Sequence, residues 1–329
     1  MKLGLLTAAV GASLLLTSVA QAVELKISHV RPQGATIDVE LKELAAAIDK
    51  ATSGKVTLKI FAASALGNYT TVQERISVGA VDMACQPAAT GADRKMQISS
   101  FPYLAETWDQ ARKIYGPGGV VRDEMAKLYA KQDITMLSAY PVYFGGISLN
   151  RDAISPGDPN ADKGIKVRVP GIKSFQLTGQ ALGYIPSPIP FSEAFTAVQT
   201  GVVDGVIGSG AEGYYASFRD VTKSYIAANT HFEVWYLIIN SGKLAELGDA
   251  EKNALMKAAA DFEEKRWKTA EADQAKNEQK LADLGAKVVQ LSTDELAASA
   301  KKVRAEVWPE ILKDVGEDWG NAILKKAQE

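Results

Sequence analysis

The sequence contains few residues of the kinds that build metal centres or disulfide-stabilised domains. Its 329 residues include one cysteine and two histidines, which excludes an internal disulfide, a four-cysteine zinc site and a three-histidine metal site. The cysteine, Cys85, lies in the apolar context Val-Asp-Met-Ala-Cys and is predicted to be a buried thiol rather than a nucleophile. The scarcity of histidine also argues against proton-transfer chemistry near neutral pH.

An excess of charge of one sign is missing as well. Lys and Arg together number 37 against 39 for Asp and Glu, a formal net charge of -2. Nucleic-acid binders usually carry a basic excess, so we expect no nucleic-acid partner. The motifs G-x-S-x-G and H-E-x-x-H, a Walker A loop and an EF-hand loop are absent. The sequence therefore predicts a protein that is not an enzyme and needs no cofactor, although paired carboxylates could still do chemistry.

Long hydrophobic runs are confined to the beginning of the chain. Met1-Lys2 is followed by an apolar run that ends in the small residues Ala20-Gln21-Ala22. A charged start, an apolar stretch and an A-x-A site predict a signal peptide over residues 1–22. The alternative is an uncleaved membrane anchor, for which the run is barely long enough. Export without a disulfide pair favours the bacterial periplasm.

The first half of the remaining chain alternates between two kinds of periodicity. Period-two patterns predict strands, and helical spacing with a stop at Gly54 or Gly79 predicts helices. The expected strands cover residues 24–30, 55–61 and 81–85, and the expected helices cover 37–51 and 70–78. This β-α-β-α-β order favours a mostly parallel sheet covered by helices.

The order recurs in the second half, where Gly201-Val-Val-Asp parallels Gly79-Ala-Val-Asp. Expected here are strands over 165–169, 201–207 and 232–239, an edge strand or loop over the proline-rich 184–190, and helices over 174–182 and 192–200. Residues 249–284, rich in Ala, Glu and Lys, predict one long helix or two abutting ones. A single helix of that length would span about 50 Å. Two further helices are expected over 295–302 and 303–312.

Several motifs along the chain, first among them the one around Arg168, carry a family resemblance. They are Lys163-Gly-Ile-Lys-Val-Arg-Val-Pro-Gly171, Ser53-Gly-Lys-Val56, Leu66-Gly67, Gly79-Ala-Val-Asp-Met83, Pro190-Phe-Ser-Glu193 and Val198-Gln-Thr-Gly-Val-Val-Asp-Gly205. Together they resemble the DctP-like solute-binding proteins of TRAP transporters, over nearly the whole chain after residue 22.

The resemblance implies an α/β, two-lobed periplasmic solute-binding protein fold with a long lobe-bridging helix. Lobe I is expected to comprise residues 23–145 plus 234–273, and lobe II residues 146–233 plus 274–329. It also implies that a monomer captures a small organic acid, a carboxylate, between the lobes and delivers it to the membrane subunits of a TRAP permease, driven by an ion gradient. A sulfonate or other oxyanion ligand, or a sensory role, stays open as an alternative.

Arg168 is the first candidate for the ligand contact. The strand pattern alone would also allow a surface arginine, but the resemblance implies that this arginine pairs with the ligand carboxylate. A guanidinium offers two parallel donors to two oxygens, which a lysine cannot reproduce. The resemblance and the cleft-facing loops add further candidates: Phe191, Tyr69, Asn68, Ser209, Glu212, Tyr214, Tyr215, His29, Arg31 and Gln86.

Two positions depart from the family pattern. Gly208 stands where many relatives have an asparagine that contacts the ligand, and Gly145 aligns loosely with a second arginine. We therefore expect a ligand anchored through one anionic group rather than two. Glu212 could accept a hydrogen bond from a ligand hydroxyl or amine, or pair with an arginine across the cleft.

Overall fold

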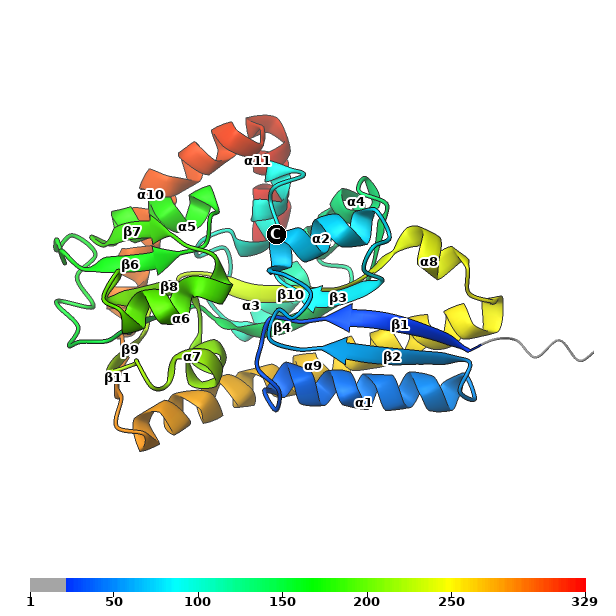
Figure 1. Ribbon diagram of the computed structural model, residues 1–329. Coiled ribbons are helices and arrows are strands. Elements are labelled where there is room, and N and C mark those ends of the chain that lie inside the picture. The colour runs from blue at the N-terminus through cyan, green and yellow to red at the C-terminus, as the bar shows by residue number, and fades with distance from the viewer. Residues whose placement is uncertain (1–21) are drawn as a thin grey trace, which may run out of the picture.

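The computed structural model describes residues 22–329, so the predicted signal peptide lies almost wholly outside the described residues. Two sheets organise the chain, one of five strands in the order β2-β1-β3-β10-β4 and one of six in the order β11-β9-β5-β8-β6-β7. They form two lobes that lie side by side, each flanked by helices (Figure 1). The predicted two-lobed α/β fold is confirmed.

The five-stranded sheet begins with the predicted β-α-β-α-β unit. Its elements are β1 (Val23–Ser28), α1 (Thr36–Ala51), β2 (Val56–Phe61), α2 (Tyr69–Ser77) and β3 (Met83–Gln86). β1 pairs in parallel with β2 and β3, as expected. The sheet is completed by β10 (Phe232–Asn240), which runs antiparallel to both β3 and β4 (Ile134–Phe144).

Cys85 on β3 is fully buried, and burial raises the pKa of its thiol well above the usual value. The prediction of a buried thiol is confirmed. Between β3 and β4 lie three elements that the sequence patterns did not predict: η1 (Arg94–Ser100), α3 (Trp108–Tyr115) and α4 (Val120–Ala130).

The six-stranded sheet contains three of the predicted elements of the second half, which became β6, β7 and β8, together with three short strands that were missed. Its strands are β5 (Gly146–Leu149), β6 (Lys166–Val169), β7 (Ile185–Pro188), β8 (Gly205–Ser209), β9 (Ser224–Ala227) and β11 (Lys287–Gln290). The helices are α5 (Lys173–Ala181), α6 (Phe191–Gln199) and α7 (Ala211–Phe218). β7 lies at the edge of the sheet, where its two prolines remove no ladder hydrogen bond from a central strand.

The long helix α9 (Asp249–Asp283) connects the lobes as one continuous element of 35 residues. It packs against α1 and β4 of one lobe and against α7 and β11 of the other, and it runs beneath both in Figure 1. The prediction of a lobe-bridging helix is confirmed. A short helix, α8 (Ser241–Ala245), precedes it. Within residues 22–329, α9 included, no helix combines the length and apolarity that a membrane span requires.

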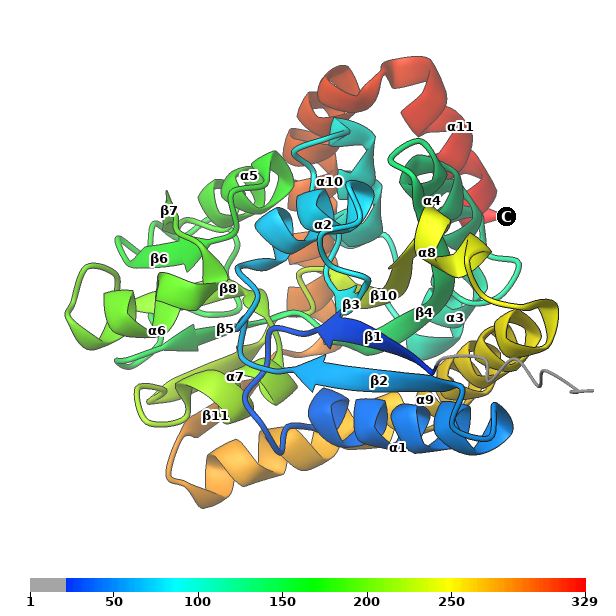
Figure 2. The same ribbon diagram turned by 45° about the vertical axis from the view of Figure 1, so that its right-hand side comes forward.

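The C-terminal segment differs from the prediction. One helix, α10 (Thr293–Val315), replaces the two expected ones, because the buried stripe Ala300, Val303, Val307 and Ile311 continues without interruption. A capping box between Ser292 and Glu295 begins this helix. α11 (Glu317–Gln328), which was not predicted, follows Gly316 and packs beside α4 (Figure 2). α10 packs on α5 beside the six-stranded sheet, whereas α11 packs on α4 beside the five-stranded sheet. The C-terminal helices therefore contact helices of both lobes, and the predicted lobe boundaries remain a prediction.

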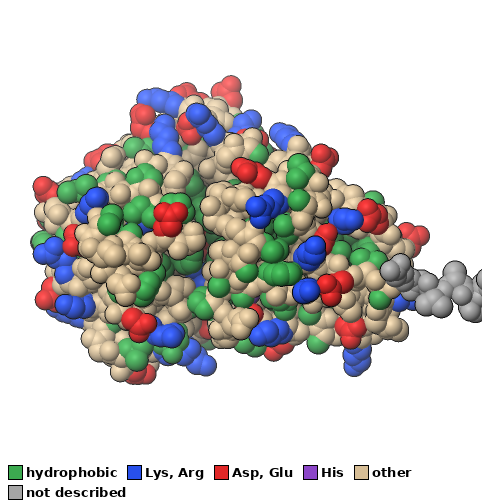
Figure 3. Space-filling model, viewed as in Figure 1, with side chains coloured by type: hydrophobic (Ala, Val, Ile, Leu, Met, Phe, Trp, Pro, Cys, Tyr) green, Lys and Arg blue, Asp and Glu red, His purple; other side chains and the backbone are tan. Residues whose placement is uncertain are grey.

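Charged side chains of both signs are mixed over the surface seen in Figure 3, without a dominant basic or acidic patch on that face. This distribution agrees with the nearly neutral composition. Such a surface offers no electrostatic footprint for a polyanion on the face shown.

Candidate functional site

A narrow cavity lies where the two sheets approach each other. Its walls come from both sheets: the loop after β1, the start of α2, residues 87–100, β4 and β10 on one side, and β6, α5, α6 and β8 on the other. The cavity has a volume of about 40 Å³. Four of the predicted site residues line this cavity, namely Arg31, Tyr69, Arg168 and Phe191.

Arg168 is buried in the cavity wall without a carboxylate partner. It lies in the middle of β6 and is only 1% exposed. Its Nε donates to the carbonyl oxygen of Ile189 at 2.7 Å, and its Nη1 is buried with no hydrogen-bond partner. Burial lowers the pKa of this arginine. A guanidinium so placed has donors ready for an anion, because an uncompensated buried charge is costly.

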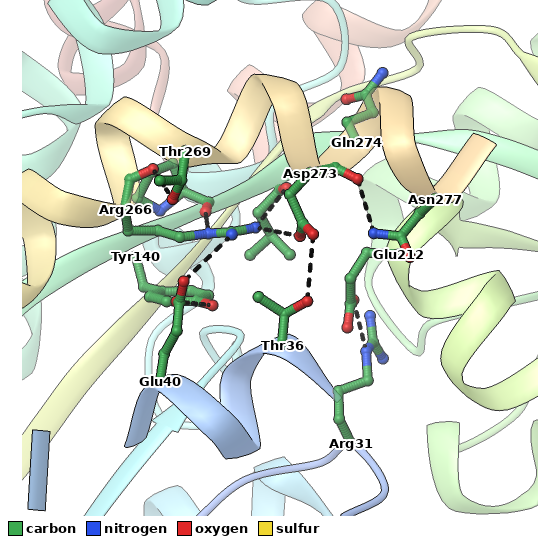
Figure 4. Close-up of polar contacts among 12 residues, drawn as sticks. Arg31, Thr36, Glu40, Tyr140, Glu212, Arg266, Thr269, Asp273, Gln274 and Asn277 are labelled. Carbon is green, nitrogen blue, oxygen red and sulfur yellow. Dashed lines mark hydrogen bonds and ion pairs between the residues drawn. The ribbon is translucent and has the colours of Figure 1, made fainter. Parts of the chain in front are cut away.

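Arg31, the second cation of the cavity wall, is already neutralised. Its Nε donates to Oε2 of Glu212 at 2.9 Å, and its Nη2 lies 3.4 Å from both the Tyr143 hydroxyl and Ser209 Oγ. Burial opposes the charge most strongly, but Glu212 and Tyr143 together outweigh it and raise the pKa of Arg31. Figure 4 shows this pair, which joins the loop after β1 to the start of α7. Of the two arrangements open for Glu212, the structure has the ion pair across the cleft.

The local sequence makes this ion pair possible. A Cβ at position 213, on the first turn of α7, would overlap Ser209 Oγ and the Arg31 guanidinium. Glycine at position 213 therefore lets the arginine reach Glu212. The rings of Phe191 and Trp235 lie 5.0 and 4.9 Å from Arg31 Cζ and cover its remaining surface.

Phe191 lies near both arginines, its ring centroid 5.0 Å from Arg31 Cζ and 5.7 Å from Arg168 Cζ. Tyr69 faces the same cavity from the first turn of α2. Asn68 and Gln86 position this tyrosine rather than line the cavity. The Asn68 side chain caps α2 by accepting from the Thr70 and Thr71 backbone N–H groups at 3.0 Å, and Gln86 Nε2 donates to the Tyr69 carbonyl at 2.7 Å.

The remaining predicted residues lie outside the cavity wall. His29 is buried with Nε2 3.3 Å from Asp38 Oδ1, and Ser209 and Glu212 contact Arg31. The Tyr214 hydroxyl lies 2.9 and 2.8 Å from the carbonyl oxygens of Gly146 and Val206, so it is a core group. Tyr215 packs near the surface, its ring 4.6 Å from Lys280 Nζ.

Comparison with known protein families identifies the family of this chain. The profile of the bacterial extracellular solute-binding protein family 7, DctP, matches residues 27–314. The chain belongs to this family. The resemblance to DctP-like proteins of TRAP transporters, inferred from the sequence motifs, is thereby confirmed.

Relatives in the DctP family are distant in sequence and close in fold. The chain is 27% identical to a C4-dicarboxylate-binding periplasmic protein of Rhodobacter capsulatus over 95% of this chain and 94% of that protein. A galactonate complex of a sugar acid binding protein from Advenella mimigardefordensis superposes with a TM-score of 0.86 at 20% identity, over 94% and 98% of the two chains. A Bordetella pertussis receptor for pyroglutamic acid gives a TM-score of 0.83 at 22% identity, over 94% and 100%.

Gly208 and Gly145, the two positions expected to depart from the family pattern, are sterically restricted. Gly208 lines the cavity with φ +95°, and a Cβ there would lie 2.6 Å from Pro170 Cδ. A Cβ at Gly145 would overlap the His231 ring and lie 2.8 Å from Thr230 Oγ1. Neither position has room for a side chain. Among the described residues that line the cavity, Arg168 is the only cation without a carboxylate partner.

One charged residue of the cavity wall was missed. Glu233 lies on β10, and its Oε1 accepts from Trp235 Nε1 at 2.8 Å while its Oε2 lies 3.1 Å from His231 Nε2. The strand was predicted, but Glu233 was not singled out as a site residue. The signal was a single glutamate in the otherwise apolar run Phe-Glu-Val-Trp-Tyr-Leu-Ile-Ile. Ser99 and Ser100 of η1 also line the cavity and belong to a segment without a predicted element.

Proposed function

We propose that the protein is the periplasmic solute-binding component of a TRAP transporter, which captures a small organic acid between its lobes and delivers it to the permease. The observation that carries the proposal is Arg168, whose buried Nη1 faces no acceptor within residues 22–329. A ligand carboxylate would accept from this guanidinium in a water-poor cavity, where charge-assisted hydrogen bonds are strong.

The relatives support an acid as the ligand. Their names mention C4-dicarboxylates, galactonate and pyroglutamic acid, all of which carry a carboxylate. In this chain one arginine rather than two is free to bind such a group, which favours one anchored carboxylate. Because the proposed lobe I and lobe II each form part of the cavity wall, a bound acid would contact both and stabilise the closed arrangement.

A thermal-shift screen tests the proposal. The protein is expressed from its full sequence, purified from the periplasmic fraction and screened against small carboxylates, keto acids, aromatic acids and sulfonates, because a ligand of the folded state raises the melting temperature. The proposal expects hits among carboxylates that disappear in Arg168→Met. Hits confined to sulfonates would make the ligand a different oxyanion, and failure of every anion to raise the melting temperature of well-folded protein would contradict the proposal.

Delivery to the permease is tested separately. Cells that contain the TRAP membrane subunits and this protein should take up the radiolabelled hit, and cells that lack the binding protein should not. Uptake that is independent of the binding protein would argue against a transport role and favour a sensory one.

A further inference from the structure

Besides the two arginines, the cavity wall contains a charged group of the opposite sign, Glu233. Glu233 comes from β10 of the five-stranded sheet, whereas Arg168 comes from β6 of the six-stranded sheet. Both line the same cavity, whose volume is about 40 Å³. A compact ligand that contacts one of them is therefore within reach of the other.

The hydrogen bonds around Glu233 identify it as an acceptor. Trp235 Nε1–H can only donate, and it donates to Oε1 at 2.8 Å. Thr230 Oγ1 lies 3.0 Å from His231 Nδ1, and His231 Nε2 lies 3.1 Å from Oε2. These contacts are satisfied when Nδ1 of His231 accepts from the Thr230 hydroxyl and its Nε2–H donates to Glu233. Each carboxylate oxygen then accepts one protein donor and keeps lone-pair capacity for another.

The other carboxylate near the cavity cannot serve the same purpose. Glu212 is paired with Arg31 and does not line the cavity. Tyr69, by contrast, lines the cavity close enough to both charges to be affected by them: burial raises the pKa of its hydroxyl, Arg168 lowers it and Glu233 raises it. The cavity wall therefore offers a cation on one side and an acceptor on the other.

We propose that Glu233 is a specificity residue of this site, which selects acids that carry an O–H or N–H donor besides the carboxylate bound by Arg168 and disfavours dicarboxylates. This inference rests on the proposed function. A ligand hydroxyl or ammonium group would donate to the Glu233 carboxylate, whereas a second ligand carboxylate would face a like charge in a confined, poorly solvated space.

Calorimetric titration with acids of one carbon skeleton tests the proposal. Propionate has no donor beyond its carboxyl group, L-lactate adds a hydroxyl, L-alanine adds an ammonium group and malonate adds a second carboxylate. The matched five-membered ring series is cyclopentanecarboxylate and L-proline. The wild-type protein should bind lactate or alanine at least tenfold more tightly than propionate, because a hydrogen bond to a charged group contributes on that scale. It should bind malonate more weakly than lactate and alanine. Tighter binding of lactate than of alanine would indicate that the ligand group that donates to Glu233 is a hydroxyl. Tighter binding of alanine would indicate an ammonium group.

The variant Glu233→Gln should reduce that preference at least threefold and bind malonate better relative to propionate than the wild type does. Glu246→Gln, the same chemical change at an exposed position, is the matched control and should leave the ranking unchanged. A purely structural role for Glu233 would change the melting temperature but not the ranking.

The outcomes separate this proposal from the proposed function. Wild-type protein that binds propionate as tightly as lactate and alanine, or a ranking that Glu233→Gln leaves unchanged, would overturn the role of Glu233 while carboxylate binding stands. If Glu233→Gln does not fold, the wild-type ranking decides alone. If no acid of either series binds although other carboxylates raise the melting temperature in the screen, the role of Glu233 is overturned and the proposed function stands. If no anion of the screen raises the melting temperature, both fall.

Discussion

Arg168 and Arg266 are equally buried, each 1% exposed, but their surroundings differ in kind. Arg266 on α9 donates from Nε to the Pro141 carbonyl at 2.9 Å and from Nη2 to Asp273 Oδ2 at 3.0 Å, and its Nη1 lies 3.7 Å from Glu40 Oε1. Figure 4 shows this network between α1, β4 and α9. Arg168 has one backbone acceptor and an unpartnered Nη1.

The comparison shows that hydrogen-bond and ion-pair partners, not burial, distinguish the structural Arg266 from Arg168, which we propose binds the ligand. Burial opposes the charge at both positions, but Tyr140, Glu40 and Asp273 outweigh it and raise the pKa of Arg266. At Arg168 burial prevails and lowers the pKa. The acids that the protein supplies to Arg266 correspond to the carboxylate that we propose the ligand supplies to Arg168.

The largest expected effect concerns the structural arginine. Arg266→Met should lower the free energy of unfolding by about 3 kcal/mol, because Glu40 and Asp273 would be left without their cation. Chemical denaturation measures this loss. Arg168→Met is the matched variant and should leave the stability of ligand-free protein unchanged or higher. Equal losses at the two positions would remove the distinction between them.

Even a conservative substitution of Arg168, the proposed ligand-binding arginine, should weaken the affinity for carboxylates. Arg168→Lys should weaken carboxylate binding by at least ~2 kcal/mol, roughly thirtyfold, because an ammonium group cannot reproduce the two parallel donors. Titration calorimetry measures the affinity, and an unfolding curve like that of the wild type shows that the fold is intact. Unchanged affinity would remove Arg168 from the site.

A third substitution tests the steric argument at the cavity wall. Gly208→Asn should destabilise the protein by at least ~1 kcal/mol and weaken binding, since it combines φ +95° with a Cβ that would lie 2.6 Å from Pro170 Cδ. Gly171→Ala is the control, because no atom lies within 4 Å of a Cβ at that position. Thermal unfolding and the carboxylate titration measure both effects, and a Gly208→Asn variant that matches the control in both would place Gly208 away from the ligand.

The smallest expected effect is a pH dependence from His29. Burial lowers the pKa of this histidine below its ordinary 6.5, against the opposing effect of Asp38. The unfolded chain therefore binds a proton more readily, and stability should fall as the pH decreases below about 6.5, by at most about 1.4 kcal/mol per pH unit. Denaturation of the wild type and His29→Gln between pH 7 and 5 compares the slopes. Identical slopes would show that His29 does not contribute.

The parts of the fold that could be predicted are those with a local pattern. The periodicity of residues 249–284 predicted α9, and the motif around Arg168 identified the buried cation. The Arg31–Glu212 pair and Glu233 could not be assigned in the same way, because the cavity joins segments from residues 30 to 235 and no local pattern states which of them meet. Neighbouring aromatics such as Tyr214 resemble binding residues in sequence, yet packing places this one in the core.

A crystal structure with the tightest-binding acid of the thermal-shift screen tests the central claim most directly. We predict that the ligand carboxylate lies within about 3 Å of Arg168 Nη1, at charge-assisted hydrogen-bond distance. A carboxylate bound elsewhere, with Nη1 of Arg168 still unpartnered, would contradict the account.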